Sequence, residues 1–150
     1  MSQSALLKHA EFELDGKLSE LGRLVEQVDQ FCLAAGLESA AAFELNLVLE
    51  ELFINAVRHG GCEGMKSAVE VRFRLLEGGA VAVEYGDRGV PFDPTAMAEP
   101  DLAAPLAERR PGGLGIHLVR QTMRDLQYVR AGEWNRLTMR REGKHEAKSI

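Results

Sequence analysis

Hydrophobic and polar residues alternate at every second position in three segments of the chain, namely residues 10–14, 68–76 and 80–85. Such alternation is typical of a strand with one face against the core and one face in water. Glu77-Gly78-Gly79 separates the second segment from the third, so these two are predicted to form an antiparallel hairpin. The pattern near the C-terminus predicts another hairpin, of residues 127–131 and 136–141, with Leu137 and Met139 turned inward.

Elsewhere the apolar residues recur at intervals of three and four, which predicts helices. The first amphipathic helix covers residues 18–35 and is ended by Gly36. A second helix is predicted over about residues 40–59, with Ser39 as its N-cap and Gly60-Gly61 at its end. Because this second helix is apolar on nearly all sides, it is predicted to be buried.

Glu51, Asn55 and His59 follow one another at intervals of four in the second helix. At about 3.6 residues per turn, this spacing places all three on one side of the helix. A carboxylate and an amide on a buried face need a polar partner. That partner is either a neighbouring loop or backbone group, as is usual for buried polar side chains, or a bound ligand, and the helix alone leaves both interpretations open.

The composition is that of one ordinary globular domain. The 150 residues are 45% hydrophobic and 27% charged, which fits a single domain over residues 1–150 with a polar tail at about 142–150. No apolar run approaches the roughly 18 residues of a membrane span, and the N-terminus lacks the apolar core of a secretory signal. We therefore expect a cytoplasmic protein without membrane contact. Cys32 and Cys62 are too few and too scattered to indicate a disulfide framework or a zinc site.

Charge is unevenly distributed along the chain. Residues 1–108 contain 8 Lys and Arg against 19 Asp and Glu, whereas residues 109–150 contain 10 against 4. The net charge of −5 argues against general nucleic-acid binding. The basic C-terminal third either accommodates a polyanionic small ligand or an acidic partner, or it is only a solvated basic face.

About twenty residues after Phe92 contain four prolines and no convincing periodicity. A loop of that length in a compact domain is usually functional, and typically a lid, which is compatible with a short helix near residues 101–108. The loop ends in a glycine-rich turn, Gly112-Gly113-Leu114-Gly115, that opens a further helix. Free backbone N–H groups and the positive end of a helix dipole suit a phosphate chain, and glycine lets the phosphate approach the backbone.

Three motifs thus follow in order: Glu51 with Asn55 on a helix, Asp87-Arg88-Gly89-Val90-Pro91-Phe92 at a strand end, and Gly112–Gly115 at a helix start. In this the sequence resembles the Bergerat-fold (GHKL) ATPases and, among them, the stand-alone anti-sigma factor serine/threonine kinases. The resemblance extends from the strand of Phe12 to Arg141. It implies an α+β two-layer sandwich, in which a mixed, mostly antiparallel sheet is covered on one face by helices. Neither a Walker GxxxxGK nor a Rossmann GxGxxG motif occurs.

The resemblance also implies a role for each motif. Glu51 would be the catalytic carboxylate and Asn55 the Mg²⁺ ligand. Asp87 would accept a hydrogen bond from the adenine amino group of ATP, while Gly89 would let the backbone approach the base. The glycines that meet the phosphates would be Gly112, Gly113 and Gly115.

Two further assignments concern the edges of the site. Thr138 would support adenine recognition, and either Arg109 or Arg110 would be the lid arginine that reaches the γ-phosphate. Pro111 and the double glycine leave the choice between the two arginines open. Neighbouring side chains are expected to be structural, since Glu50 projects about 100° away from Glu51 around the helix. The other expected structural side chains are His59, His117, Tyr128 and Trp134.

The implied function is that of an ATP-binding anti-sigma factor in a partner-switching circuit of transcription regulation. As a serine/threonine kinase it would phosphorylate an anti-anti-sigma protein of the STAS fold, and it would alternatively sequester a sigma factor. The other candidate is a non-catalytic module in which nucleotide only sets partner choice; retention of Glu51 and Asn55 favours the enzyme. No direct nucleic-acid contact is expected, and homodimerisation, frequent in the family, is not decided by any residue here.

Overall fold

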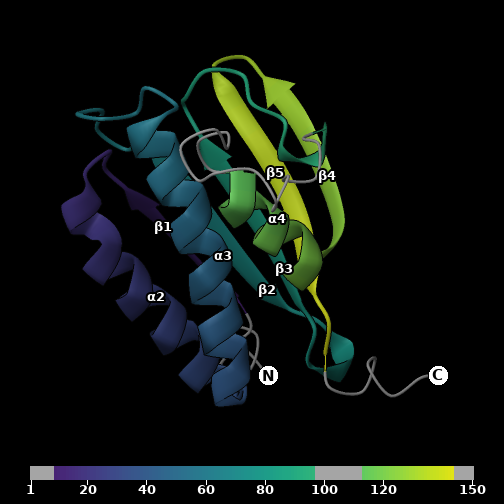
Figure 1. Ribbon diagram of the computed structural model, residues 1–150. Helices are drawn as coiled ribbons and strands as arrows, with labels where there is room; N and C mark the ends of the chain where they lie inside the picture. Colours follow the sequence, from purple (N-terminus) through teal and green to yellow (C-terminus); the bar gives the residue numbers. More distant parts are fainter. Residues whose placement is uncertain (1–8, 97–112, 144–150) are drawn as a thin grey trace.

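The computed structural model describes residues 9–96 and 113–143, which form two layers, a sheet and a set of helices packed on one of its faces (Figure 1). The strands are β1 (His9–Leu14), β2 (Val69–Leu75), β3 (Val81–Asp87), β4 (Arg124–Ala131) and β5 (Trp134–Arg141). The helices are α2 (Leu21–Ala34), α3 (Ser39–Arg58) and α4 (Gly113–Thr122), with short 3-10 turns η1 (Leu18–Glu20), η2 (Glu77–Gly79) and η3 (Pro94–Ala96). The predicted α+β two-layer sandwich is confirmed.

The strands pair in the order β1-β2-β3-β5-β4, and every pairing among the described strands is antiparallel. Both predicted hairpins, β2 with β3 and β4 with β5, are present. The central strand β3 ends at Asp87, and the loop that follows it contacts the end of α3 through the hydrogen bond from Val90 N to Gly60 O. This topology leaves β1 and β4 as the two edges of the sheet.

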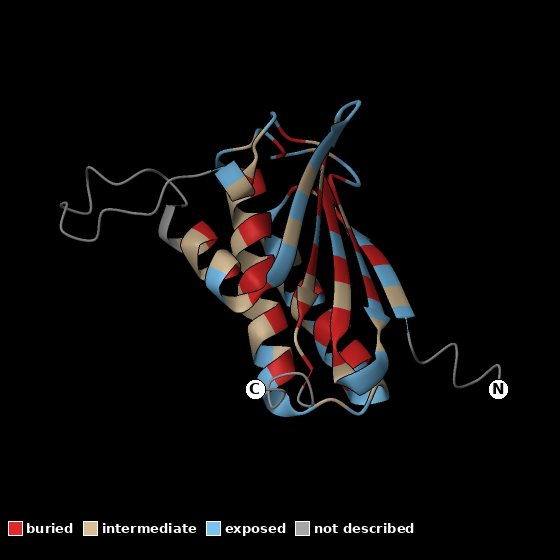
Figure 2. Cartoon of the chain, turned by 90° about the vertical axis from the view of Figure 1, so that its right-hand side faces the viewer, coloured by how far each residue is buried: buried red, intermediate tan, exposed pale blue. Residues whose placement is uncertain are grey.

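The core lies between the sheet and the helices. Buried residues alternate with more exposed ones along the strands, which Figure 2 shows as red bands separated by tan and pale blue ones. Phe73 of β2 stacks on Phe31 of α2 with ring centroids 4.9 Å apart. Leu137 and Met139 are buried as predicted. Alternation therefore predicts correctly which strand face meets the helices.

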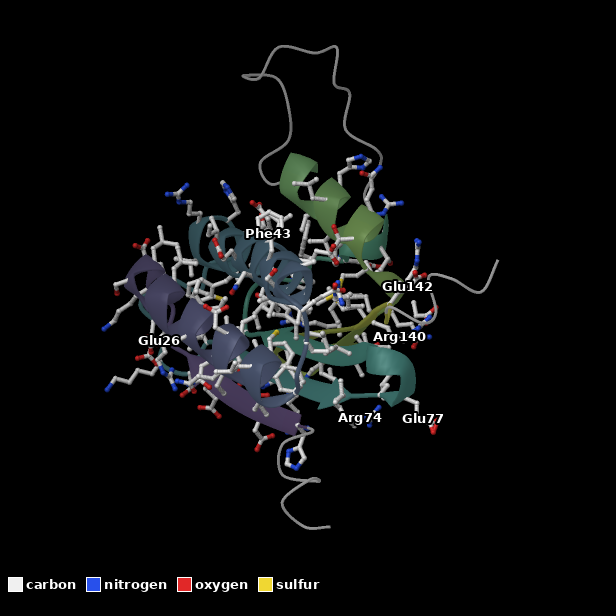
Figure 3. The ribbon with its side chains drawn as sticks, turned by 90° about the horizontal axis from the view of Figure 1, so that it is seen from below. Glu26, Phe43, Arg74, Glu77, Arg140 and Glu142 are labelled. Carbon is white, nitrogen blue, oxygen red and sulfur yellow. The ribbon has the colours of Figure 1, made fainter. Side chains whose placement is uncertain are left out.

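The opposite face of the sheet is polar and carries ion pairs between strands. Arg72 of β2 lies 3.1 Å from Glu11 of β1, and Arg136 of β5 lies 2.8 Å from Glu70 of β2. The second pair spans β3, because Gly86 leaves room there; a Cβ at Gly86 would lie 2.7 Å from Arg136 Nη1. Figure 3, seen from below, shows Arg74 and Arg140 on the sheet and Phe43 on the helix layer.

The helix boundaries differ slightly from those predicted. Residues 18–35 divide into the 3-10 turn η1 and α2, and Gly36 follows with a φ of +71°. The predicted N-cap Ser39 is the first residue of α3, because Glu38 is the residue with extended backbone angles at the cap position, and it makes no side-chain cap hydrogen bond. No helix among the described residues is long and apolar enough to cross a membrane.

Candidate functional site

Glu51 of α3 lies against the start of α4. A Cβ built on Gly115, the third residue of α4, would lie 2.0 Å from Glu51 Oε2 and 2.8 Å from Glu51 Cδ. Real Cβ atoms do not approach other atoms so closely, so any side chain at position 115 would displace the carboxylate. Gly115 therefore allows an acidic side chain to sit beside the first turn of a helix, where N–H groups have no partner within the helix.

Glu51 and Asn55 are half-buried rather than buried. The inward side of α3 is formed by other residues, such as Val48, Leu52 and Ala56, which pack against the core. The expectation of a fully buried polar face was wrong because the face that carries Glu51 and Asn55 points along the layer, toward α4. Because both side chains stay partly exposed, water can still hydrogen-bond to them.

Glu50 is affected by the charge of Glu51, although the two side chains project from different sides of α3. Burial raises the pKa of Glu50 above its ordinary value, and the negative charge of Glu51 raises it further. Partial loss of water and a nearby like charge both disfavour the charged form of Glu50. Glu50 is half-buried, as is Glu51.

Asn55 lies one helical turn after Glu51, near the end of α3. Its backbone carbonyl accepts from the N–H groups of both His59 and Gly60, which closes the helix. The described residues contain no cluster of three or more His, Cys, Asp or Glu that could hold a metal ion. A Mg²⁺ on the Asn55 amide oxygen would therefore take most of its ligands from phosphates and water, as Mg²⁺ commonly does.

Asp87 is the buried carboxylate of the site, with 9% of its surface exposed. Its Oδ1 accepts two hydrogen bonds, from Gly89 N at 3.0 Å and from Asn135 Nδ2 at 2.8 Å. A buried charge is tolerated when hydrogen bonds replace its water, and these two do so on one oxygen.

Gly89 connects the loop after β3 to the end of α3. A Cβ at Gly89 would lie 2.9 Å from Gly60 O and 3.1 Å from Asp87 Oδ1, so only glycine fits without a shift of the backbone. The N–H of Val90 also donates to Gly60 O, at 2.9 Å. The Asp87 loop and the C-terminal end of α3 are therefore held together by backbone contacts.

Tyr85 and Cys62 complete the buried surroundings of Asp87. The Tyr85 hydroxyl crosses from β3 to α3 and donates to Leu52 O at 3.1 Å. Burial, followed by the charge of Asp87, raises the pKa of Tyr85 well above its ordinary value. The same two causes raise the pKa of Cys62 to about 11. Both the Tyr85 hydroxyl and the Cys62 thiol are therefore neutral at physiological pH.

The structure does not bring Thr138 to Asp87. Thr138 is exposed on the polar face of the sheet, in register with Glu84 and Gln127. The residue opposite Asp87 on β5 is Asn135, three positions earlier. β5 begins at Trp134, two residues before the predicted start, and this earlier segment carries the side chain that contacts Asp87.

Sequence reasoning missed Asn135, although a signal was present. The phase that turns Leu137 and Met139 inward also turns Asn135 inward, since successive inward residues are two apart. A polar residue in an apolar phase needs hydrogen-bond partners. Tyr128 and Arg130, on β4, are two of those partners.

The start of α4 corresponds to the predicted glycine-rich turn. Gly113 is its first residue and Gly115 its third, so both belong to the turn with free N–H groups. Arg109, Arg110 and Gly112, like the segment predicted to be a lid, lie outside the described residues. The choice between the two arginines therefore stays a prediction.

The three predicted motifs meet at α3 and its C-terminal end, through the contact of the Asp87 loop with Gly60 and of Gly115 with Glu51. Asp87 offers a buried acceptor at one end, where Gly89 keeps the backbone accessible. The start of α4 offers N–H donors at the other end, and α3 connects the two with Glu51 and Asn55. Two carboxylates, an amide and helix N–H donors are the groups that a phosphoryl-transfer or ATP-hydrolysis site uses.

Residues 14–141 match the family of histidine kinase-like ATPase domains, to which this chain belongs. The predicted membership of the Bergerat-fold ATPases is thereby confirmed. The serine/threonine-protein kinase BtrW of Bordetella bronchiseptica (strain ATCC BAA-588 / NCTC 13252 / RB50) is 35% identical over 97 residues, which are 65% of this chain and 68% of the relative.

The fold itself recurs in a solved structure of low sequence identity. The crystal structure of the RsbU and RsbW domains of Rv1364c from Mycobacterium tuberculosis matches with a TM-score of 0.62 and 14% identity. The match covers 90% of this chain and 33% of that chain, so the present chain spans about a third of that longer protein. At this identity the likeness concerns the fold alone.

Proposed function

We propose that this protein is a Mg-ATP-dependent serine/threonine protein kinase that acts as a cytoplasmic anti-sigma regulatory factor. Its phosphate acceptor would be a STAS-type anti-anti-sigma protein, and a sigma factor would be its alternative partner. The observation that carries the proposal is the contact between the Glu51 carboxylate and the start of α4 at Gly115. The kinship with a serine/threonine-protein kinase supports the same class.

The base end of the site would be formed by β3 and the loop that follows it. Asp87 would accept a hydrogen bond from the adenine amino group, and Gly89 would keep the backbone close to the base. Mg²⁺ held by the Asn55 amide oxygen would neutralise phosphate charge.

The phosphate end would be formed by α4 and α3. Gly113 and Gly115 would present backbone N–H groups to the phosphates. Glu51 would accept or orient the proton of the acceptor hydroxyl, which requires its carboxylate to stay beside those N–H groups. Arg109 or Arg110, with Gly112, would complete this end.

The decisive test is phosphate transfer to a captured partner. Proteins that bind the wild-type chain are captured from the native lysate and incubated with Mg-ATP, and phosphoserine and phosphothreonine are then measured. Glu51→Gln keeps the shape of the side chain, so ATP affinity should stay within about threefold, whereas transfer should fall at least about a hundredfold, the usual loss for a general base. Glu50→Gln removes a charge one position earlier and should retain transfer.

One result would contradict the kinase proposal. If the wild-type chain binds a partner and ATP but no phosphate is transferred, and Glu51→Gln leaves partner binding unchanged, the chain is a nucleotide-dependent binding module.

The proposed base site is tested separately. Asp87→Asn should weaken ATP binding by about 1–3 kcal/mol, because the amide presents a donor where the adenine amino group needs an acceptor. An unchanged dissociation constant, measured by calorimetry, would exclude Asp87 from base recognition.

A further inference from the structure

Asn135 has acceptors around its amide nitrogen. The residue lies on β5 opposite Asp87, and only 6% of its surface is exposed. Its Nδ2 donates to Asp87 Oδ1 at 2.8 Å and to Val90 O at 2.8 Å, with Gly89 O at 3.4 Å. The amide nitrogen of Asn135 thus donates hydrogen bonds to the Asp87 carboxylate and to two backbone carbonyls of the loop after Asp87.

The amide oxygen of Asn135 has donors around it instead. Tyr128 OH donates to Oδ1 at 2.6 Å, and Phe92 N and Arg130 Nη1 each donate at 3.2 Å. Arg130 also donates to Gly89 O at 2.7 Å. The oxygen end is therefore surrounded by a phenol, a backbone amide and a guanidinium.

These two environments determine the orientation of the amide. A rotation that exchanged Nδ2 and Oδ1 would point an oxygen at the Asp87 carboxylate and an NH₂ group at Arg130. Asn135 is therefore a fixed donor toward Asp87. This donor and Gly89 N both bind Oδ1, so they restrict the rotation of the Asp87 carboxylate and leave Oδ2 outside these two hydrogen bonds.

We propose that Asn135 is the positioning residue of the base site: it orients Asp87 toward the 6-amino group of adenine and thereby sets the preference for adenine over purines that lack this group. This inference rests on the function proposed above. Tyr128 and Arg130 support Asn135 from the edge strand β4, so base selectivity depends on a part of the sheet that lies away from α3.

The test compares two nucleotides that differ only in the amino group. Dissociation constants of Mg-ATP and of Mg-purine riboside triphosphate are measured for the wild type, for Asn135→Leu and for the control Val129→Thr at an exposed position of β4. The wild type and the control should prefer ATP by about tenfold or more, the usual effect of one matched buried hydrogen bond. Asn135→Leu should reduce the preference to less than about threefold, with purine riboside triphosphate still bound at near wild-type affinity.

The outcomes separate the two proposals. If Asn135→Leu weakens both nucleotides by the same factor, Asn135 is only structural and the inference is overturned. If the wild type itself shows no preference for ATP, the assignment of Asp87 to adenine fails, and the positioning inference fails with it. A preference that persists in Asn135→Leu overturns the inference alone.

A second variant covers the case in which Asn135→Leu does not fold. Asn135→Asp keeps the shape and places a second carboxylate oxygen beside Asp87 Oδ1, while its other oxygen still accepts from Arg130. A proton shared between the two acids replaces the amide donor at low pH and is lost as pH rises. Burial and the charge of Asp87 raise the pKa of Tyr85 and of Cys62, so both stay neutral over this range. The charged side chain that faces position 135 from β4 is the Arg130 guanidinium. The ATP preference of this variant should therefore fall as pH rises, against a flat wild-type profile, and a flat profile in the variant overturns the inference.

Discussion

Gly115 has no side chain, and this leaves the space that the Glu51 carboxylate occupies. Gly115→Ala should lower phosphate transfer at least about tenfold, because the new methyl group occupies the position of the Glu51 carboxylate. Stability should change little, since alanine favours the helix by up to about 1 kcal/mol while Glu51 rotates away. Transfer assays and urea unfolding measure the two effects.

Gly22 provides the matched control for this substitution. It lies in α2, and a Cβ there would have nothing within 4 Å. Gly22→Ala should therefore stabilise the protein by about 0.5–1 kcal/mol and leave transfer unchanged. Equal transfer rates for Gly115→Ala and Gly22→Ala would mean that the position of Glu51 does not matter for catalysis.

At the scale of the element, α3 packs one side against the core and carries two adjacent carboxylates, Glu50 and Glu51. The raised pKa of Glu50 means that the folded state binds its proton more tightly than the unfolded state. Ionisation of Glu50 therefore lowers the free energy of unfolding. This loss of stability develops as pH rises from about 4 through the raised pKa of Glu50. Glu50→Gln removes that loss.

Glu50→Gln should consequently be more stable than the wild type at pH 7, by less than about 1 kcal/mol since water screens a half-buried charge. At pH 3.5 the two proteins should be equally stable. Urea unfolding at both pH values measures the difference. A variant that is more stable by the same amount at both pH values would show that packing, rather than charge, is responsible.

Arg141 acts at the scale of the whole molecule, because it connects the last strand to the helix layer. Its side chain is 9% exposed, and its Nε donates to Glu44 of α3 at 2.9 Å. Arg141→Met should reduce the free energy of unfolding by about 1–3 kcal/mol, as expected for loss of a partly buried charged hydrogen bond.

Arg124 is the control for this connection between layers. It pairs with Glu142 at 2.6 Å, but its side chain is 55% exposed. Arg124→Met should therefore cost less than about 1 kcal/mol in the same unfolding experiment. If both variants lose equal stability, burial of Arg141 contributes nothing.

Most of the secondary structure could be predicted because burial of one face imposes a regular spacing on the apolar residues. The strand and helix patterns identified every strand and the three helices of the described residues to within a few positions. The start of α3 was predicted one residue too late, because Ser39 is a preferred N-cap type whereas the backbone angles place the cap at Glu38. The burial of Glu51 was overestimated, since composition does not reveal which helix side faces a neighbour.

The site could be predicted where chemistry is local and could not where it depends on strand register. Asp87, Gly89 and Gly115 follow from motifs of adjacent residues, and the structure places each at the region expected. The partner of Asp87 depends on which residue of β5 lies opposite, which is a long-range property. β5 pairs Asn135 with Asp87, whereas Thr138 has the opposite phase and lies opposite Glu84.

The neighbourhood of Trp134 has a consequence for measurement. It is the single tryptophan of the chain. The guanidinium carbon of Arg136 lies 4.5 Å from its ring centroid and that of Arg88 lies 5.9 Å away. Arg88 stands between Asp87 and Gly89, so any rearrangement of that loop changes the cation beside the indole. The protein therefore carries an intrinsic fluorophore next to the proposed base site, and we expect its emission to change when a nucleotide binds, without any added dye.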